Sequence, residues 1–168
     1  MAEGKRDVDV KTVDQSAVST VRLARAAAFL ASLAANDRWD KLALSGGLRD
    51  VVFAPGRCTA TLRVGHSHTN VYNTMHGGCV ATIVDCVSTS AFATTSDADG
   101  VASELSVSYL RPVRPGTEVI VEATVRKSGR TAAVVTIDVS LAGSGELAAT
   151  ARHTISLSGQ AQLLTSKL

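Results

Sequence analysis

The sequence predicts an α+β domain in which an antiparallel β-sheet curls around one long, buried α-helix. Several segments alternate apolar and polar residues with a period of two, which is typical of half-buried strands. Residues 77–94 instead carry apolar side chains on every face with small residues between them, which is typical of a buried helix. Composition agrees, because 45% of residues are hydrophobic but only 4% are aromatic, favouring a sheet packed on a small-residue helix.

A single domain is expected from the 168 residues, which are enough to build one core. No internal repeat or linker interrupts residues 16–157, which we interpret as that domain, between a flexible tail over 1–15 and a second tail over 158–168. The formal net charge of +2 is too small to indicate a nucleic-acid partner. The longest apolar run, 23–35, is interrupted by Arg25 and is shorter than the roughly 20 residues of a membrane span, so no span is predicted.

The remaining elements follow from local patterns. A helix is expected over 16–36, where Ser16 can cap it, and a hairpin is expected from Leu48–Ala54 and Cys58–Val64. Four further strands are predicted over 101–110, 117–126, 131–141 and 146–157. Because short segments rich in Gly, Pro and Ser connect them, we expect these four strands to pair sequentially and antiparallel.

Several kinds of site are disfavoured. The chain has three cysteines in an irregular pattern, too few for a disulfide framework or a zinc site, and we interpret Cys79 and Cys86 as small core residues. His66 and His68 have an H-x-H spacing but no third ligand nearby in the sequence, so no metal is expected. The sequence also lacks the G-x-S-x-G elbow of serine hydrolases and the P-loop of nucleotide hydrolases.

The sequence ends with Ser166, Lys167 and Leu168, the S-K-L tripeptide that the peroxisomal import receptor reads. The alternative is a frayed tail without function. We expect the tripeptide to bind that receptor and to direct the protein to the peroxisome or a related microbody, such as a glycosome.

Two features of the buried helix indicate chemistry. Asp85 is its single charged residue, and a carboxylate in apolar surroundings costs several kcal/mol unless it is paired, hydrogen-bonded or neutralised. Such carboxylates cluster at functional sites, although bonding to a nearby Thr or Ser is the alternative. Gly77 and Gly78 follow His76 at the helix start, where backbone N–H groups lack internal partners and can bind a ligand oxygen. This is the outline of an oxyanion hole, unless the glycines only let the chain turn.

The spacing of these two features restricts how they can act together. Gly77 and Asp85 are eight residues apart, or about 12 Å along a helix axis, whereas groups acting on one carbonyl lie within about 3 Å of their targets. If both residues act on one carbonyl, Asp85 must come from a second chain of a homo-oligomer.

The motifs together resemble a known family. The runs that carry the resemblance are His68-Thr69-Asn70, His76-Gly77-Gly78, Asp85 and Tyr109-Leu110-Arg111-Pro112. They resemble the hotdog-fold acyl-CoA thioesterases of the phenylacetate-pathway and 4-hydroxybenzoyl-CoA thioesterase-like type, over about residues 45–157. The resemblance implies a hotdog fold, with the sheet wrapped around the central helix, assembled into dimers and usually tetramers. It also implies hydrolysis of fatty or aryl acyl-CoA to free acid and CoA, without a cofactor because CoA is part of the substrate.

Roles for individual residues follow from the resemblance. It implies that Asp85 is the general base or nucleophile, that the Gly77 N–H polarises the carbonyl, and that Asn70 positions the carbonyl or the water. His76 is implied to orient the loop and the helix start. The implied CoA contacts are Tyr109 and the turn of Lys127, Ser128, Gly129, Arg130 and Thr131. A solvated hairpin tip is the alternative for that turn.

The chain departs from the family pattern at two positions. Ala102 stands where these enzymes often have Ser or Thr, and a one-residue shift in a strand would point the adjacent Ser103 to the opposite face. Asn73 replaces a common Gly and is one of the residues that best tolerate a positive φ. Two alternative functions remain open: a hotdog acyl-CoA hydratase or dehydratase that uses His76, and a non-catalytic acyl-CoA-binding protein.

Overall fold

The computed structural model describes residues 10–12 and 20–157. The helices are α1 (Thr20–Ala35), α2 (Trp39–Ala43) and α3 (Gly77–Ala93), with a short 3-10 helix η1 (His66–His68). The strands are β1 (Val10–Thr12), β2 (Leu48–Ala54), β3 (Arg57–Arg63), β4 (Val101–Tyr109), β5 (Glu118–Ser128), β6 (Ala132–Leu141) and β7 (Leu147–Ser156).

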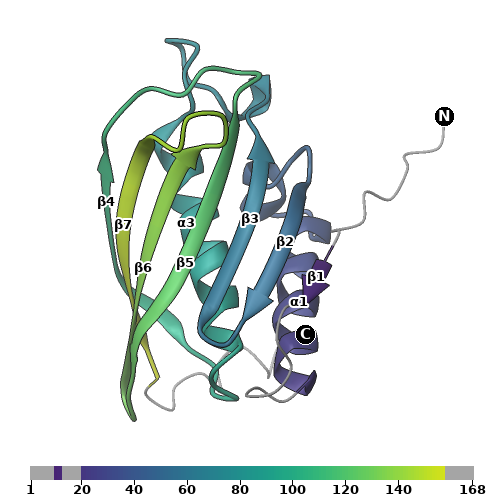
Figure 1. Cartoon of the computed structure of the whole chain (residues 1–168), viewed down its shortest axis with the longest axis vertical. Coiled ribbons are helices and arrows are strands. Elements are labelled where there is room, and N and C mark those ends of the chain that lie inside the picture. Colours follow the sequence, from purple (N-terminus) through teal and green to yellow (C-terminus); the bar gives the residue numbers. More distant parts are fainter. Residues whose placement is uncertain (1–9, 13–19, 158–168) are drawn as a thin grey trace, which may run out of the picture.

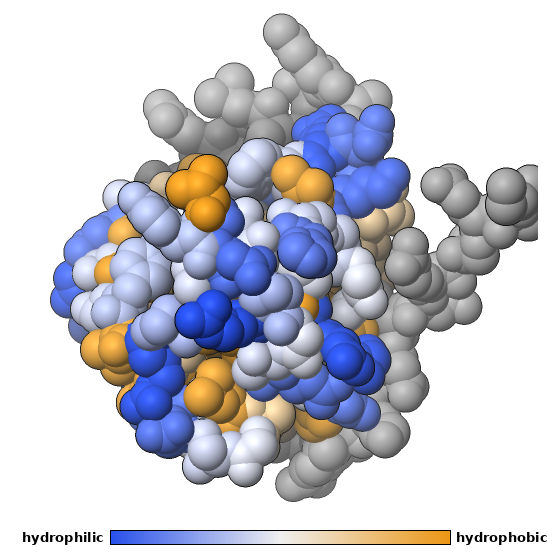
Figure 2. All heavy atoms as spheres, turned by 90° about the horizontal axis from the view of Figure 1, so that it is seen from above, coloured by the Kyte–Doolittle hydropathy of each residue, from blue (hydrophilic) through white to orange (hydrophobic). Residues whose placement is uncertain are grey.

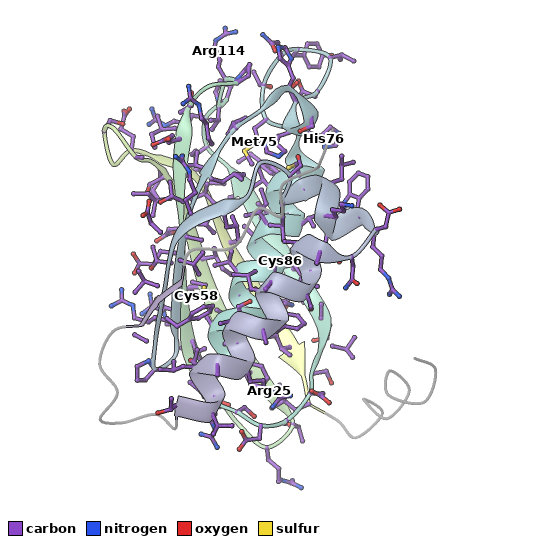
Figure 3. The ribbon with its side chains drawn as sticks, turned by 90° about the vertical axis from the view of Figure 1, so that its right-hand side faces the viewer. Arg25, Cys58, Met75, His76, Cys86 and Arg114 are labelled. Carbon is purple, nitrogen blue, oxygen red and sulfur yellow. The ribbon has the colours of Figure 1, made fainter. Side chains whose placement is uncertain are left out.

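Within the described residues, the seven strands form one sheet in the order β1-β2-β3-β5-β6-β7-β4 (Figure 1). All neighbouring pairs are antiparallel except β1 and β2, which are parallel. The sheet curls around α3, and α1 lies across α3 on the side away from the sheet (Figure 3). The predicted sheet around a buried helix, with an added N-terminal helix, is therefore confirmed.

Alternation along β5 explains how the sheet and α3 share one core. Val119, Val121 and Ala123 are buried on the helix side, as the period-two pattern predicts. Helix α3 presents Ile83 and Val84 to this core, and both side chains are almost fully buried. Helix α3 also buries residues on its other faces, because α1 and α2 pack against it opposite the sheet.

The expected pairing of β4 with β5 is wrong. Strand β4 pairs with β7 at the edge of the sheet, whereas β5, β6 and β7 pair sequentially as expected. The segment 110–117 is not a hairpin turn: Leu110 N–H still donates to Ala148 O, and Val113 O accepts from Met75 N–H. The chain therefore crosses from the β4 edge to the middle of the sheet over the start of α3.

Other differences concern short elements and the chain ends. The sequence analysis did not predict α2 or β1, and β1 falls within the predicted tail over 1–15. The described part of the N-terminal helix begins at Thr20, and the predicted cap Ser16 lies outside the described residues. The tripeptide ending at Leu168 also lies outside them.

The edge strand β4 exposes apolar side chains. Val101, Tyr109 and Leu110 are each more than half exposed, with relative exposures of 52%, 56% and 54%. An edge strand also presents backbone donors and acceptors that a further strand can pair with. None of the helices in the described ranges is long and apolar enough to span a bilayer.

Candidate active site

The start of α3 is fixed by the side chain before it. His76 has extended backbone angles, and its Nδ1 accepts a hydrogen bond from the Gly78 N–H at 2.9 Å. This N-cap occupies one of the four N–H groups that a helix start leaves unpaired. The Gly77 N–H lies outside that bond and belongs to the set without an acceptor inside the helix.

The loop before the helix is held by Asn70. Its Oδ1 accepts from the N–H groups of Tyr72 and Thr74, at 2.9 and 3.3 Å, and from the Thr74 hydroxyl at 3.2 Å. Asn73 lies in this turn with a φ of 56°, the positive value expected to suit Asn. With Oδ1 engaged in the turn, the Nδ2 amide of Asn70 is the group available to donate to a ligand.

Gly77 lies against a ring from the edge strand. The Tyr109 hydroxyl donates to Gly77 O at 2.9 Å, and a Cβ on residue 77 would lie 3.1 Å from Tyr109 Cζ. That distance is tighter than ordinary contact, so glycine is what lets Tyr109 approach the helix start. The structure thus brings together three predicted site residues: Asn70, Gly77 and Tyr109.

These three residues line a pocket of about 370 Å³ at this end of the molecule. Its other walls come from the start of α3, from the segment after β4 and from β6 and β7; they are Thr74, Met75, Val80, Leu110, Arg111, Pro112, Val113, Val139, Ala148 and Ala149. The pocket is therefore lined mainly by apolar residues, together with the polar side chains of Asn70, Thr74, Tyr109 and Arg111. Seen from above, this end shows separate hydrophobic groups among hydrophilic side chains (Figure 2).

Asp85 lies farther along α3, outside this pocket. Its side chain is 43% exposed, and Thr89 Oγ1 donates to Asp85 Oδ1 at 3.4 Å. Burial raises the pKa of Asp85, and the carboxylate of Asp40 on α2 raises it further, whereas His153 and the Thr89 hydroxyl lower it. Asp85 is therefore a carboxylate of increased basicity that solvent can reach, as a general base requires.

The sequence analysis missed His153 on β7. This histidine is fully buried, with its Nε2 3.5 Å from Asp85 Oδ1 and its Nδ1 2.7 Å from Ser88 Oγ. Burial lowers the pKa of His153, while the charge of Asp85 raises it. The sequence offered only a lone histidine at an inward position of a strand, with no motif around it. Its approach to Asp85 depends on how β7 packs against α3.

The two ends of α3 remain separate within one chain. Figure 3 shows His76 at the start of the helix and Cys86, the neighbour of Asp85, farther along. The predicted CoA-contacting turn, 127–131, is exposed and lies at the opposite end of the sheet from the start of α3 (Figure 1). One chain therefore does not bring Asp85 or this turn to the pocket at Gly77.

The missing hydroxyl at Ala102 is not replaced by Ser103. A β-bulge separates Ala102, which pairs with Ile155, from Glu104, which pairs with Thr154. Ser103 is the extra residue, and its hydroxyl donates to Thr154 O at 3.0 Å. At the position that pairs with Ile155, β4 therefore carries a methyl group where the family pattern has a hydroxyl.

Other candidate ligands lie outside this site. Within residues 10–12 and 20–157, no group of three or more His, Cys, Asp or Glu side chains is arranged to hold a metal ion. Cys79 is a free, buried thiol, and burial raises its pKa to about 11. The interpretation of Cys79 and Cys86 as small core residues is consistent with their burial.

Comparison with known proteins assigns the family. A family model described as the thioesterase superfamily matches residues 72–148, which include Gly77 and Asp85. The crystal structure of zebrafish thioesterase superfamily member 2 matches with a TM-score of 0.72 and 32% identity, over 77% of this chain and 94% of that one. The chain belongs to the thioesterase superfamily. Its sheet and central helix are those of the hotdog thioesterases, as the sequence motifs implied.

Two further proteins to which this chain is similar have names that mention coenzyme A. Human acyl-coenzyme A thioesterase 13 is 37% identical over 89 residues, 52% of this chain and 64% of the human protein. This match therefore spans less than two thirds of the human protein. A hypothetical thioesterase from Streptococcus pneumoniae, solved with coenzyme A, has a TM-score of 0.60 and 26% identity, over 64% of this chain and 83% of that one.

Proposed function

We propose that this protein hydrolyses acyl-CoA thioesters to free acid and CoA. The observation that carries the proposal is the half-site in which the Gly77 N–H and the Asn70 amide border one apolar pocket. A thioester oxygen placed there would accept hydrogen bonds from both donors, and such donors typically contribute about 2.7–4 kcal/mol each in the transition state. The names of the human and bacterial relatives support a thioester of CoA as the substrate.

The water would be activated by Asp85 from a second subunit. Helix geometry separates Gly77 and Asp85 by about 12 Å, so one copy of α3 cannot place both at one carbonyl. Pairing of two copies along the exposed edge strand β4 would cover the apolar side chains of Val101, Tyr109 and Leu110. An isologous dimer would build two equivalent sites, and two dimers would form the tetramer implied by the resemblance.

In that arrangement the exposed turn 127–131 would also come from a neighbouring subunit. Lys127 and Arg130 supply two cations, and the turn N–H groups can bind phosphate oxygens. The 3′-phosphate and diphosphate of CoA are the groups that such a turn would contact. Tyr109 would contact the substrate from the pocket side.

Thiol release from a panel of acyl-CoA esters tests the activity. We expect turnover in the wild type, and a loss of about 10²–10⁴-fold in Asp85→Asn, which keeps the shape of the side chain but removes the base. Asp85→Asn should fold like the wild type by circular dichroism. Turnover of Asp85→Asn at the wild-type rate would exclude Asp85 as the base, and an ultraviolet change of enoyl-CoA without thiol release would favour the hydratase.

Mixed oligomers test the contribution of two subunits. Asn70→Asp keeps the Oδ1 that holds the loop and removes the amide donor, while Asp85→Asn removes the base. If each site uses Asn70 of one chain and Asp85 of another, co-refolding the two inactive variants restores activity, because half of the sites in each mixed dimer are intact. A site within one chain predicts no recovery, since neither chain then has both residues.

The peroxisomal localisation stays a prediction, since Ser166, Lys167 and Leu168 lie outside the described residues. It would place the proposed hydrolysis in a compartment reached through the import receptor.

A further inference from the structure

His153 has a nitrogen whose surroundings do not satisfy it. Its side chain is fully buried, and Nε2 has no hydrogen-bond partner among the described residues. A buried polar group without a partner loses its hydrogen bonds to water and gains none in return, which is unfavourable. The carboxylate oxygen Oδ1 of Asp85 lies 3.5 Å from this nitrogen. This distance is too long for a resting hydrogen bond but short enough for one to form when a proton arrives.

Ser88 determines which nitrogen of His153 carries hydrogen. The Ser88 hydroxyl lies 3.0 Å from the backbone oxygen of Asp85, which can only accept, and 2.7 Å from His153 Nδ1, which can donate or accept. A hydroxyl has one hydrogen. Both contacts are hydrogen bonds only if Ser88 donates to the Asp85 oxygen and Nδ1–H donates to Ser88. The neutral ring then has its lone pair on Nε2, facing Asp85.

We propose that Ser88 and His153 are positioning residues for Asp85: Ser88 holds His153 as the Nδ1–H tautomer, and Nε2 stabilises the proton that Asp85 takes from water. This inference rests on the proposed hydrolysis. As the water oxygen bonds to the thioester carbon, its O–H bond breaks and the proton moves to Asp85, where it is shared with Nε2. When the C–S bond breaks, the electron pair goes to sulfur and Asp85 returns the proton to it, giving acid and CoA thiol.

The charged groups around the pair support this assignment. Asp85 faces His153 from β7 and Asp40 from α2, and it accepts from Thr89 on its own helix. Asp40 also lies 4.0 Å from the Cys86 thiol. His153 Nε2 lies 3.5 Å from Asp85 Oδ1 and can accept a proton shared with it, whereas Asp40 acts on Asp85 through its charge.

Nitrogen-15 NMR of ring-labelled histidine tests the tautomer without any turnover. We expect His153 to be neutral at pH 7, with Nδ1 protonated and Nε2 unprotonated. In Ser88→Ala the acceptor for Nδ1–H is lost, so the ring should change to the Nε2–H tautomer, whose hydrogen can reach Asp85. The internal reference is His68, whose Nδ1 accepts from the Gly65 N–H and which should stay Nε2–H. A resting Nε2–H tautomer or a charged ring for His153 would overturn the inference.

The pH dependence of kcat provides the second measurement. We expect Ser88→Ala to lower kcat about tenfold, with KM changed less, and to shift the acidic limb to lower pH because an Nε2–H donor stabilises ionised Asp85. Ser88→Thr keeps the hydroxyl and should restore the wild-type profile. The control is Ser90→Ala, since Ser90 is equally buried and donates only to Cys86 O on the same helix.

The two proposals fail in different ways. A wild type that releases no thiol from any acyl-CoA refutes the proposed hydrolysis and with it the proton transfer. A wild type that hydrolyses acyl-CoA while Ser88→Ala keeps its kcat profile refutes only the positioning role of Ser88 and His153.

Discussion

Substituting Gly77 by alanine tests whether close packing at the helix start is needed for activity. A Cβ on residue 77 would lie 3.1 Å from Tyr109 Cζ and 3.2 Å from its hydroxyl oxygen, so the ring must move. Crowding of this kind typically costs about 1–3 kcal/mol, and the lost Tyr109 hydrogen bond to Gly77 O about 0.5–1.5 kcal/mol. Because Tyr109 is 56% exposed and can move outward, we expect about 1 kcal/mol of lost stability.

The effect on activity should be larger than the effect on stability. Gly77→Ala keeps the backbone N–H but changes the pocket wall, and we expect kcat/KM to fall about tenfold, equivalent to about 1.4 kcal/mol. Thiol release and thermal unfolding measure the two effects, with Gly143→Ala as control because a Cβ there meets nothing within 4 Å. If Gly77→Ala lowers kcat/KM by the same factor in a Tyr109→Val background, crowding of the Tyr109 ring is not the cause of the loss of activity.

Three other predictions concern stability and localisation. Burial lowers the pKa of His68, so the stability that its neutral form contributes is present above the unfolded pKa of about 6.5 and is lost as pH falls. The free energy of unfolding from urea titrations should therefore decline below about pH 6.5, and less steeply in His68→Asn than in the wild type. Equal slopes of this free energy against pH in the two proteins would contradict the prediction. Gly100→Ala would place a Cβ 2.3 Å from the Cγ2 of buried Ile155, so we expect a loss of about 1–3 kcal/mol and a Tm several degrees lower; an unchanged Tm would disprove the close contact. Deleting Leu168 from a fluorescently tagged chain should abolish peroxisomal import, and undiminished import would exclude the tripeptide as the signal.

The sequence predicted what depends on local pattern. Period-two alternation identified β5 and β6, and the uninterrupted apolar character of 77–94 identified the buried helix α3. The helix-start motif around Gly77 was recognisable because its residues are contiguous. Asp85 was recognisable because a charge in an apolar helix is costly.

Features that depend on packing between distant segments were not predictable in this way. The pairing of β4 with β7 depends on the path of segment 110–117, whose prolines and glycine also fit a hairpin turn. His153 meets Ser88 across 65 residues, and the proximity of Asp40 to Asp85 requires α2, a helix of five residues that is too short for a periodic pattern. These contacts are set by how β7 and α2 pack on α3.

The loop held by Asn70 has a consequence for the thermodynamics of substrate binding. Three hydrogen bonds to its Oδ1, with the bridge between Thr69 and Met75, hold this loop within the fold itself. If the proposed donors bind the thioester oxygen, the conformational entropy of ordering them is lost during folding rather than during binding, which preserves affinity and reduces reorganisation in the transition state. Calorimetry with a non-hydrolysable acyl-CoA analogue should accordingly report little entropy loss from loop ordering.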